Sequence, residues 1–260
     1  MGAYAPMHTF FSGNDYSELN SYAKQMEIQI GVSKVRKYAT SESGDTLEFI
    51  ERPGGGISVV LADGQRSGKS AKRISNKVAG KVVGLLAEGI RDGAAARAVS
   101  DFLYHERGGK VMSTLNIISA DFTSNTLVLT RNNPAPMMIG RGQQVEALDE
   151  PCMAIGTRLG TRPVISQMPI EAGLTILVYT DGLNHAGERS GNPIDLAACF
   201  QSFLAENQTS AQQIADRLLQ TALALDSNRP GDDISVVVFQ VLAEARDQIR
   251  RVSLSLPLDS

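Results

Sequence analysis

The stretch Ile57-Ser-Val-Val-Leu-Ala-Asp-Gly-Gln-Arg-Ser-Gly-Lys-Ser-Ala71 decides the fold of this 260-residue chain. Residues 57–62 form a mostly apolar run, which predicts a buried strand that ends at Asp63. A short polar loop follows, and from Ser67 to Glu88 apolar residues recur at helical spacing, which predicts a helix with one apolar face. Because an unpaired carboxylate at the end of a core strand is costly, Asp63 indicates a bound cation.

The residues before this strand predict a hairpin that brings two carboxylates together. Thr46 to Glu51 is a predicted strand, 53–56 a tight turn, and Ile57 to Ala62 the antiparallel partner. Asp45 lies just before the first strand and Asp63 just after the second. The two carboxylates should therefore meet at one edge of a sheet although they are far apart in sequence.

Along the rest of the chain, groups of strands alternate with pairs of helices. Strands are predicted at 26–38, 112–120, 126–130, 137–139, 144–148, 164–168, 174–179 and 232–242, and helices at 93–107, 194–206 and 211–225. Most strands are joined as hairpins, which indicates the α+β class, with antiparallel sheets covered by helix pairs. Residues 1–25 are predicted to form an N-terminal arm with a short helix at 17–25, residues 26–242 one domain, and residues 243–260 a charged C-terminal tail.

Composition limits the classes of function. Apolar residues make up 42% of the chain, enough for a sizeable core, and the net charge of -3 gives no indication of a nucleic-acid or membrane partner. No run approaches the roughly 18 apolar residues of a membrane helix, and the N-terminus lacks a signal-peptide pattern, so a cytoplasmic location is expected. Cys152 and Cys199 stand in apolar or helical settings and are predicted to be reduced, buried thiols.

Four carboxylates lie at the predicted ends or starts of strands: Asp45, Asp63, Asp181 and Asp232, with Asp233 adjacent. No histidine or cysteine accompanies them, and an all-oxygen set favours Mg²⁺ or Mn²⁺ over Zn²⁺. Two such ions would neutralise the cluster and, at about 3.5–4 Å apart, suit phosphoryl hydrolysis. The glycines after Asp63 and Asp181 should let the backbone approach a ligand closely, and leave the Gly64 carbonyl free to coordinate.

Four ordered motifs resemble those of the metal-dependent (PPM, type 2C) protein serine/threonine phosphatases: Ser43-Gly-Asp45, Ala62-Asp-Gly-Gln-Arg-Ser-Gly68, Tyr179-Thr-Asp-Gly-Leu183 and Gly231-Asp-Asp-Ile-Ser-Val-Val237. The resemblance spans residues 26–242 and is strongest to the bacterial branch of sporulation stage II protein E and the stressosome phosphatases. It implies a β-sandwich flanked by helical layers (α-β-β-α), with two Mn²⁺ or Mg²⁺ ions at one end.

The resemblance also implies a role for each acidic residue. Asp63 would bridge both ions, Asp45 and the Gly64 carbonyl would complete one of them, and Asp181 and Asp232 would hold the other. Catalysis would depend on Asp63 and Asp181. The implied reaction is attack of metal-activated water on a phosphoserine or phosphothreonine, without a phosphoenzyme. Its implied substrate is a bacterial regulatory protein, either an anti-sigma-factor antagonist or a stressosome-like protein.

Other functions fit parts of the sequence. Gly64 to Ser70, after a strand and before a helix, mimics a nucleotide-binding P-loop, but three residues separate its glycines where a P-loop has four. A phosphatase-like binding module without activity would be indicated by loss of a metal-binding aspartate, and all are present. Thr114 is interpreted as an ordinary sheet residue, and 132–134 as a structural turn. The family's phosphate-binding Arg and general-acid His have no evident counterpart.

Overall fold

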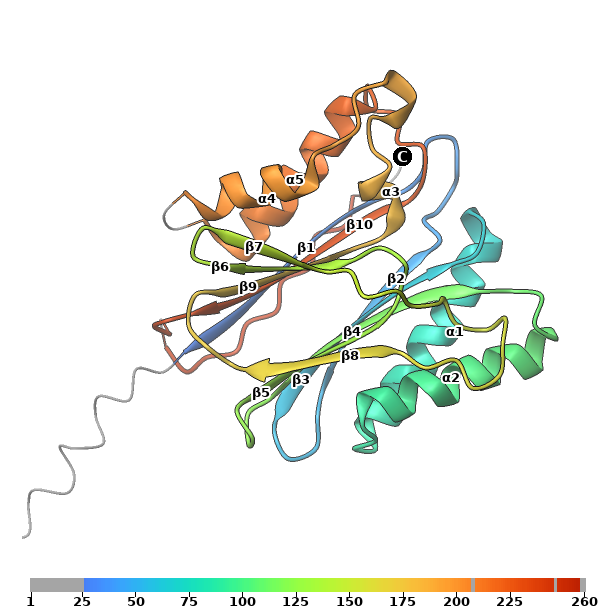
Figure 1. Cartoon of the computed structure of the whole chain (residues 1–260), viewed down its shortest axis with the longest axis horizontal. Coiled ribbons are helices and arrows are strands. Elements are labelled where there is room, and N and C mark those ends of the chain that lie inside the picture. Colours follow the sequence, from blue (N-terminus) through green and yellow to red (C-terminus); the bar gives the residue numbers. More distant parts are fainter. Residues whose placement is uncertain (1–25, 207–208, 246, 258–260) are drawn as a thin grey trace, which may run out of the picture.

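The computed structural model describes residues 26–257, except 207, 208 and 246, as two stacked antiparallel sheets between two layers of helices (Figure 1). This arrangement confirms the predicted α+β class and its α-β-β-α order. The arm at 1–25, with its predicted helix, lies outside the described residues. In the described part of 243–260 no helix or strand is present.

Sheet A has the strand order β1-β10-β9-β6-β7, and every neighbouring pair is antiparallel. Its strands are β1 (Glu27–Val35), β6 (Met137–Arg141), β7 (Gln144–Leu148), β9 (Leu174–Tyr179) and β10 (Ile234–Leu242). Sheet B has the order β2-β3-β4-β5-β8 and is also antiparallel throughout. Its strands are β2 (Asp45–Glu51), β3 (Gly56–Gly64), β4 (Ser113–Asp121), β5 (Thr126–Asn132) and β8 (Val164–Pro169).

Each sheet is covered on its outer face by one pair of helices (Figure 1). Helices α1 (Gly68–Ala87) and α2 (Asp92–Arg107) pack on sheet B, and α4 (Leu196–Leu204) and α5 (Ala211–Leu225) pack on sheet A. A one-turn helix, α3 (Asp181–Asn184), and a 3₁₀ turn, η1 (Glu188–Ser190), connect β9 to α4. No helix in the described part of the chain is both long and apolar enough to cross a membrane.

The alternation of side chains along β3 explains why this strand lies in the middle of the structure. Val59 and Leu61 point into the sandwich between the sheets, whereas Val60 and Ala62 point toward α1 and α2. A strand buried on both faces needs a continuous apolar run, which the sequence supplies at 57–62. Since successive side chains alternate, the next inward position after Leu61 is Asp63.

Close backbone packing joins α5 to the edge strand β1. A Cβ atom added to Gly31 would overlap the backbone carbonyl group of Ala211, the first residue of α5. This helix begins with a capping box, in which Ser210 and Gln213 each hydrogen bond the other's backbone amide. The glycine therefore lets the helix terminus approach the sheet to a distance that no other residue allows.

Near the acidic residues, the observed ends of several strands differ from the predicted ends. Asp45 is the first residue of β2 and Asp63 lies within β3, so both belong to the sheet rather than to its flanking loops. The last strand, β10, begins at Ile234, which leaves Asp232 in the preceding turn. Helix α3 was not predicted because four residues are too short to show a helical period.

The P-loop alternative is wrong for this fold. Strand β3 pairs antiparallel with both β2 and β4, whereas a P-loop follows a strand of a parallel sheet. The backbone between β3 and α1 also turns through positive φ angles at Arg66 and Gly68, in a short loop that joins the strand directly to the helix.

Candidate active site

A row of three residues crosses sheet B at the end of the sandwich. Asp45 of β2 lies directly opposite Asp63 of β3, and Asp63 lies directly opposite Thr114 of β4. Directly opposed side chains lie on the same face with Cβ atoms about 4.5–5.5 Å apart. The prediction that Asp45 and Asp63 lie close together is therefore confirmed. The two residues are paired within the sheet, whereas the sequence placed them in the loops at its edge.

Asp45 connects the two sheets. Its side chain is fully buried, and its Oδ2 atom accepts hydrogen bonds from Thr180 Oγ1 at 3.0 Å and from Ser235 Oγ at 2.6 Å. Both donors belong to sheet A or its end, so the Asp45 carboxylate points inward between the sheets. Its other oxygen, Oδ1, is buried and has no hydrogen-bond partner among the described residues. One oxygen is thus held in place while the other keeps its capacity to bind.

Two loops of sheet A bring further carboxylates to the same end of the sandwich. Asp181 is the first residue of α3, directly after β9, and Asp232 lies in the turn before β10. These loops are in contact, because a Cβ atom added to Gly182 would overlap the carbonyl oxygen of Asp233. The glycine after Asp181 therefore admits another backbone segment.

The glycine after Asp63 has the same role. A Cβ atom at Gly64 would overlap the carbonyl oxygen of Ala71 in α1. The glycine allows α1 to pack directly on the end of β3, which is a reason for a glycine here that the sequence did not indicate. Helix α1 is thereby held next to Asp63.

The adjacent aspartates Asp232 and Asp233 have different surroundings. Asp233 is buried, and its two carboxylate oxygens accept hydrogen bonds from the backbone N–H groups of Lys37 and Gly44, both at 2.8 Å. The side chain of Asp232 is 44% exposed, and Lys37 Nζ lies 4.0 Å from its Oδ1 atom. Asp233 is thus committed to holding the loop between β1 and β2. Asp232 accepts a hydrogen bond from the backbone N–H of Asp233 at its Oδ1 atom, at 2.9 Å, and its Oδ2 atom stays available to a ligand.

Burial and mutual repulsion dominate the electrostatics of this end. Burial, followed by the charges of Asp45 and Asp181, raises the pKa of Asp63 to about 9. Burial also raises the pKa of Asp45 to about 6, although the Ser235 hydrogen bond opposes the change. The pKa of Asp181 rises as well, through burial and then the charge of Asp232. Each of these carboxylates is therefore destabilised in its charged form unless a cation joins them.

Two lysines that the sequence did not place beside the acidic residues approach Asp45 from its backbone side. Lys34 Nζ and Lys72 Nζ both donate hydrogen bonds to the Asp45 carbonyl oxygen, and Lys72 also donates to Thr46 Oγ1 at 3.1 Å. Burial and then the Lys72 charge lower the pKa of Lys34 to about 8. No sequence signal marks this pair, because Lys34 lies in β1 and Lys72 in α1.

The residues at this end suit a hard divalent cation. Their donors are carboxylate and carbonyl oxygens, the preferred ligands of Mg²⁺ and Mn²⁺, and the Asp45 Oδ1 atom is buried and unpartnered within the described residues. In the described ranges, no three His, Cys, Asp or Glu side chains converge tightly enough to form a ready-made ion site. Asp45 and Asp63 lie directly opposite each other, and a cation would have to draw the carboxylates of the sheet A loops toward this pair.

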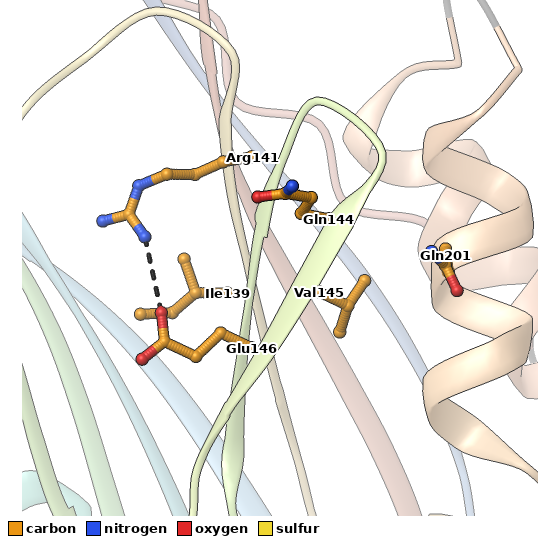
Figure 2. Close-up of a pocket in the computed structure, with 6 residues that line it drawn as sticks. All are labelled: Ile139, Arg141, Gln144, Val145, Glu146 and Gln201. Carbon is orange, nitrogen blue, oxygen red and sulfur yellow. Dashed lines mark ion pairs between the residues drawn. The ribbon is translucent and has the colours of Figure 1, made fainter.

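A separate hollow of about 340 Å³ lies between the β6–β7 hairpin and α4 (Figure 2). Arg141 and Glu146 form an ion pair at 3.7 Å on its wall. Because Arg141 pairs with Leu174 at the start of β9 while Asp181 follows the end of that strand, the hollow lies at the opposite end of the sheet from the acidic row. It takes no part in the site described above.

Comparison with known proteins identifies relatives of this chain. The family model "Stage II sporulation protein E (SpoIIE)" matches residues 53–242. The stage II sporulation protein E of Bacillus subtilis (strain 168) is 22% identical over 229 residues, which cover 88% of this chain and 27% of that protein. The chain therefore spans about a quarter of the length of that relative.

Solved structures share the fold. The PP2C phosphatase domain of SpoIIE from Bacillus subtilis, with a fragment of its regulatory domain, has a TM-score of 0.73 at 21% identity and covers 84% of this chain and 64% of that one. RsbX in complex with magnesium has a TM-score of 0.64 at 17% identity, covering 84% and 99%. The catalytic domain of the serine/threonine phosphatase PstP with two manganese ions has a TM-score of 0.63 at 17% identity, covering 84% and 100%. With its family model matched over most of the described residues, the chain belongs to the stage II sporulation protein E family, and it shares the fold of the PP2C phosphatase domain of SpoIIE.

Proposed function

We propose that this chain is a Mn²⁺- or Mg²⁺-dependent protein phosphatase that hydrolyses phosphoserine or phosphothreonine on a bacterial regulatory protein in the cytoplasm. The observation that carries the proposal is the inward-facing row of Asp45 and Asp63, whose charged forms are disfavoured by burial and by each other. A protein keeps such carboxylates together when a cation compensates them. The PP2C phosphatase domain of SpoIIE, which shares this fold, supports phosphate hydrolysis as the reaction class.

We assign the metal ligands by their positions and available atoms. Asp63 would bridge two ions, Asp45 and the Gly64 carbonyl would complete one, and Asp181 and Asp232 would complete the other. Asp232 is preferred to Asp233 because both oxygens of Asp233 already accept backbone hydrogen bonds. When bound, two such ions supply a water of lowered pKa and positive charge for the phosphate oxygens.

The remaining residues of the site hold these ligands. Thr180 and Ser235 fix one oxygen of Asp45 and leave Oδ1 for a cation. Lys34 and Lys72 donate hydrogen bonds to the Asp45 carbonyl oxygen, so they hold the backbone of β2 beside Asp63 and place two positive charges next to the acidic residues. Preorganisation of this kind lowers the free energy needed to order the site during the reaction.

The relatives support the metal and the class of partner. RsbX has been solved with magnesium and PstP with manganese, which supports either ion for this chain. SpoIIE is described as a cell fate determinant, which supports a regulatory phosphoprotein as the substrate. We propose that the substrate is an anti-sigma-factor antagonist or a stressosome-like protein.

Hydrolysis of phosphoserine and phosphothreonine peptides and of p-nitrophenyl phosphate tests the proposal. Wild type should be active with Mn²⁺ or Mg²⁺ and inactive in EDTA, and Asp181→Asn should lose at least about 100-fold in rate. Asp149→Asn, which changes an exposed carboxylate after β7, is the matched control and should retain full activity. If the folded wild type binds Mn²⁺ yet hydrolyses none of these substrates, the chain is a phosphatase-like binding module and the proposal is wrong.

A further inference from the structure

Asn116 is a buried polar residue that the proposed ligand set does not use. It lies in β4, its side chain is 2% exposed, and neither its Oδ1 nor its Nδ2 atom has a hydrogen-bond partner among the described residues. Ile118 and Ala120 of the same strand face the core between the sheets, and residues two apart in a strand share a face. Asn116 therefore points into the sandwich, toward its acidic end.

The register places Asn116 between the acidic row and a buried cation. Its direct neighbours across the sheet are Leu61 of β3 and Arg131 of β5. Asp63, two residues beyond Leu61, is its diagonal neighbour at about 7–8 Å, a distance that polar side chains span with one water. On the inner face of β4, Asn116 is thus the next side chain after Thr114, which lies directly opposite Asp63.

Arg131 gives this position a fixed electrostatic field. Arg131 is 2% exposed, and its guanidinium donates hydrogen bonds to the carbonyl oxygens of Asn133 and Glu150. Arg131 therefore neighbours Asn116 on the β5 side, and Asp63 lies diagonally from it on the β3 side. An amide between opposite charges is oriented with its oxygen toward the cation and its NH₂ toward the anion.

Leaving this amide without partners would be costly. A buried donor or acceptor that makes no hydrogen bond costs about 1–3 kcal/mol. The Oγ1 atom of Thr114, two residues before Asn116 on the same face, is also buried without a partner in the described part of the chain. The two Cα atoms are about 7 Å apart along the strand, so one water between their side chains could hydrogen bond to both.

We propose that Asn116 is a positioning residue for the metal-binding carboxylate Asp63. In this proposal its amide and the Thr114 hydroxyl hold a buried water that donates a hydrogen bond to the Asp63 carboxylate and fixes its orientation. The inference rests on the proposed function, because it gives Asp63 a metal to bind. Groups that orient a metal ligand in this way are typically worth 10- to 100-fold in metal affinity.

Mn²⁺ titration calorimetry on the full chain tests the proposal with a readout independent of turnover. Asn116→Leu, which keeps the size and removes the amide, should weaken Mn²⁺ binding at least about 10-fold. Thr114→Val, which removes the hydroxyl, should also weaken Mn²⁺ binding. Thr114→Ser, which keeps the hydroxyl, should bind Mn²⁺ with an affinity within about threefold of wild type. In EDTA, Asn116→Leu should melt at or above the wild-type temperature, because it removes a buried polar group.

Thr130→Val is the matched control. Thr130 is fully buried and its Oγ1 atom also has no partner among the described residues, but it lies opposite Ile117, which faces α1 and α2. Its loss should leave Mn²⁺ affinity within about twofold of wild type. Should Asn116→Leu fail to fold, Thr114→Val tests the same water from its other side.

The outcomes separate this inference from the proposed function. If wild type binds Mn²⁺ and hydrolyses phosphopeptides while Asn116→Leu and Thr114→Val bind Mn²⁺ equally well, the positioning role alone is overturned. If Thr130→Val weakens binding as much as they do, the effect belongs to general packing and the proposal is also wrong. If wild type neither binds Mn²⁺ nor hydrolyses, the proposed function and this inference fall together.

Discussion

Replacing Asp63 with asparagine should stabilise the metal-free protein while it abolishes metal-dependent hydrolysis. Burial and the charges of Asp45 and Asp181 raise the pKa of Asp63 to about 9 from the usual 3.8. The folded protein therefore keeps a proton on Asp63 at pH values where the unfolded chain has lost it. Such a group contributes its full stability below about pH 4 and loses it as the pH rises toward 9.

The size of the effect follows from this window. One proton held by the folded state alone changes the free energy of unfolding by about 1.4 kcal/mol per pH unit. Between pH 5 and pH 8 the upper limit is about 4 kcal/mol. Because Asp63 is partly exposed and Asp45 can take part of the proton, we expect roughly half, about 2 kcal/mol. For a domain of this size that is about 4–8 °C in melting temperature.

Calorimetric melting in EDTA at pH 5 and pH 8 measures this difference. Asp63→Asn and wild type should melt within about 2 °C of each other at pH 5, and the variant should melt about 4–8 °C higher than wild type at pH 8. Asp149→Asn, at an exposed position, should follow wild type at both pH values. The prediction is refuted if Asp63→Asn melts no higher than wild type at pH 8, or if the difference in melting temperature does not grow with pH. Either result would mean that burial and charge repulsion do not destabilise the ionised Asp63 carboxylate.

Three further predictions concern neighbouring residues. Asp233→Ala should cost about 2–3 kcal/mol in unfolding free energy, since one buried and one partly buried N–H group lose their acceptor. Asp232→Ala should change the unfolding free energy by under about 1 kcal/mol, and equal losses in denaturant titrations would contradict this. Gly64→Ala should lower the melting temperature by at least about 5 °C, because its Cβ atom overlaps a carbonyl of α1, and a wild-type melting curve would disprove that packing. Cys152→Ser and Cys199→Ser should keep turnover within about twofold of wild type, and loss of activity in a folded variant would point to a thiol mechanism.

The sequence was most informative where hydrophobic patterns were long. The run at 57–62 predicted a buried strand, and the helical spacing after Ser67 predicted α1 to within a residue. These predictions succeeded because a strand or helix buried on one or both faces must carry the matching period of apolar residues. Short elements carry too few residues for a period, which is why α3 was missed and why Asp181 was expected at the end of a strand alone.

The order of the aspartate motifs also specified the family and the residues worth assigning to a metal. Each carboxylate stands beside a strong strand signal, so its place at one end of a sheet followed from local patterns alone. Pairing of Asp45 with Asp63 could be predicted because a tight turn fixes the register of a hairpin.

Only the tertiary structure decided which polar groups meet inside the sandwich. Thr180 and Ser235 donate to Asp45 across 135 and 190 residues, and Asn116 stands behind Asp63 through the pairing of β3 with β4. These contacts depend on how two sheets stack and on strand order, which local sequence does not encode. Local sequence patterns therefore specify which carboxylates are present and where each strand ends. The stacking of the two sheets determines which carboxylates are buried, which repel one another and which side chains bind them. The physical reason is that burial and electrostatic repulsion arise only when residues from different strands and loops are assembled at one end of the sandwich.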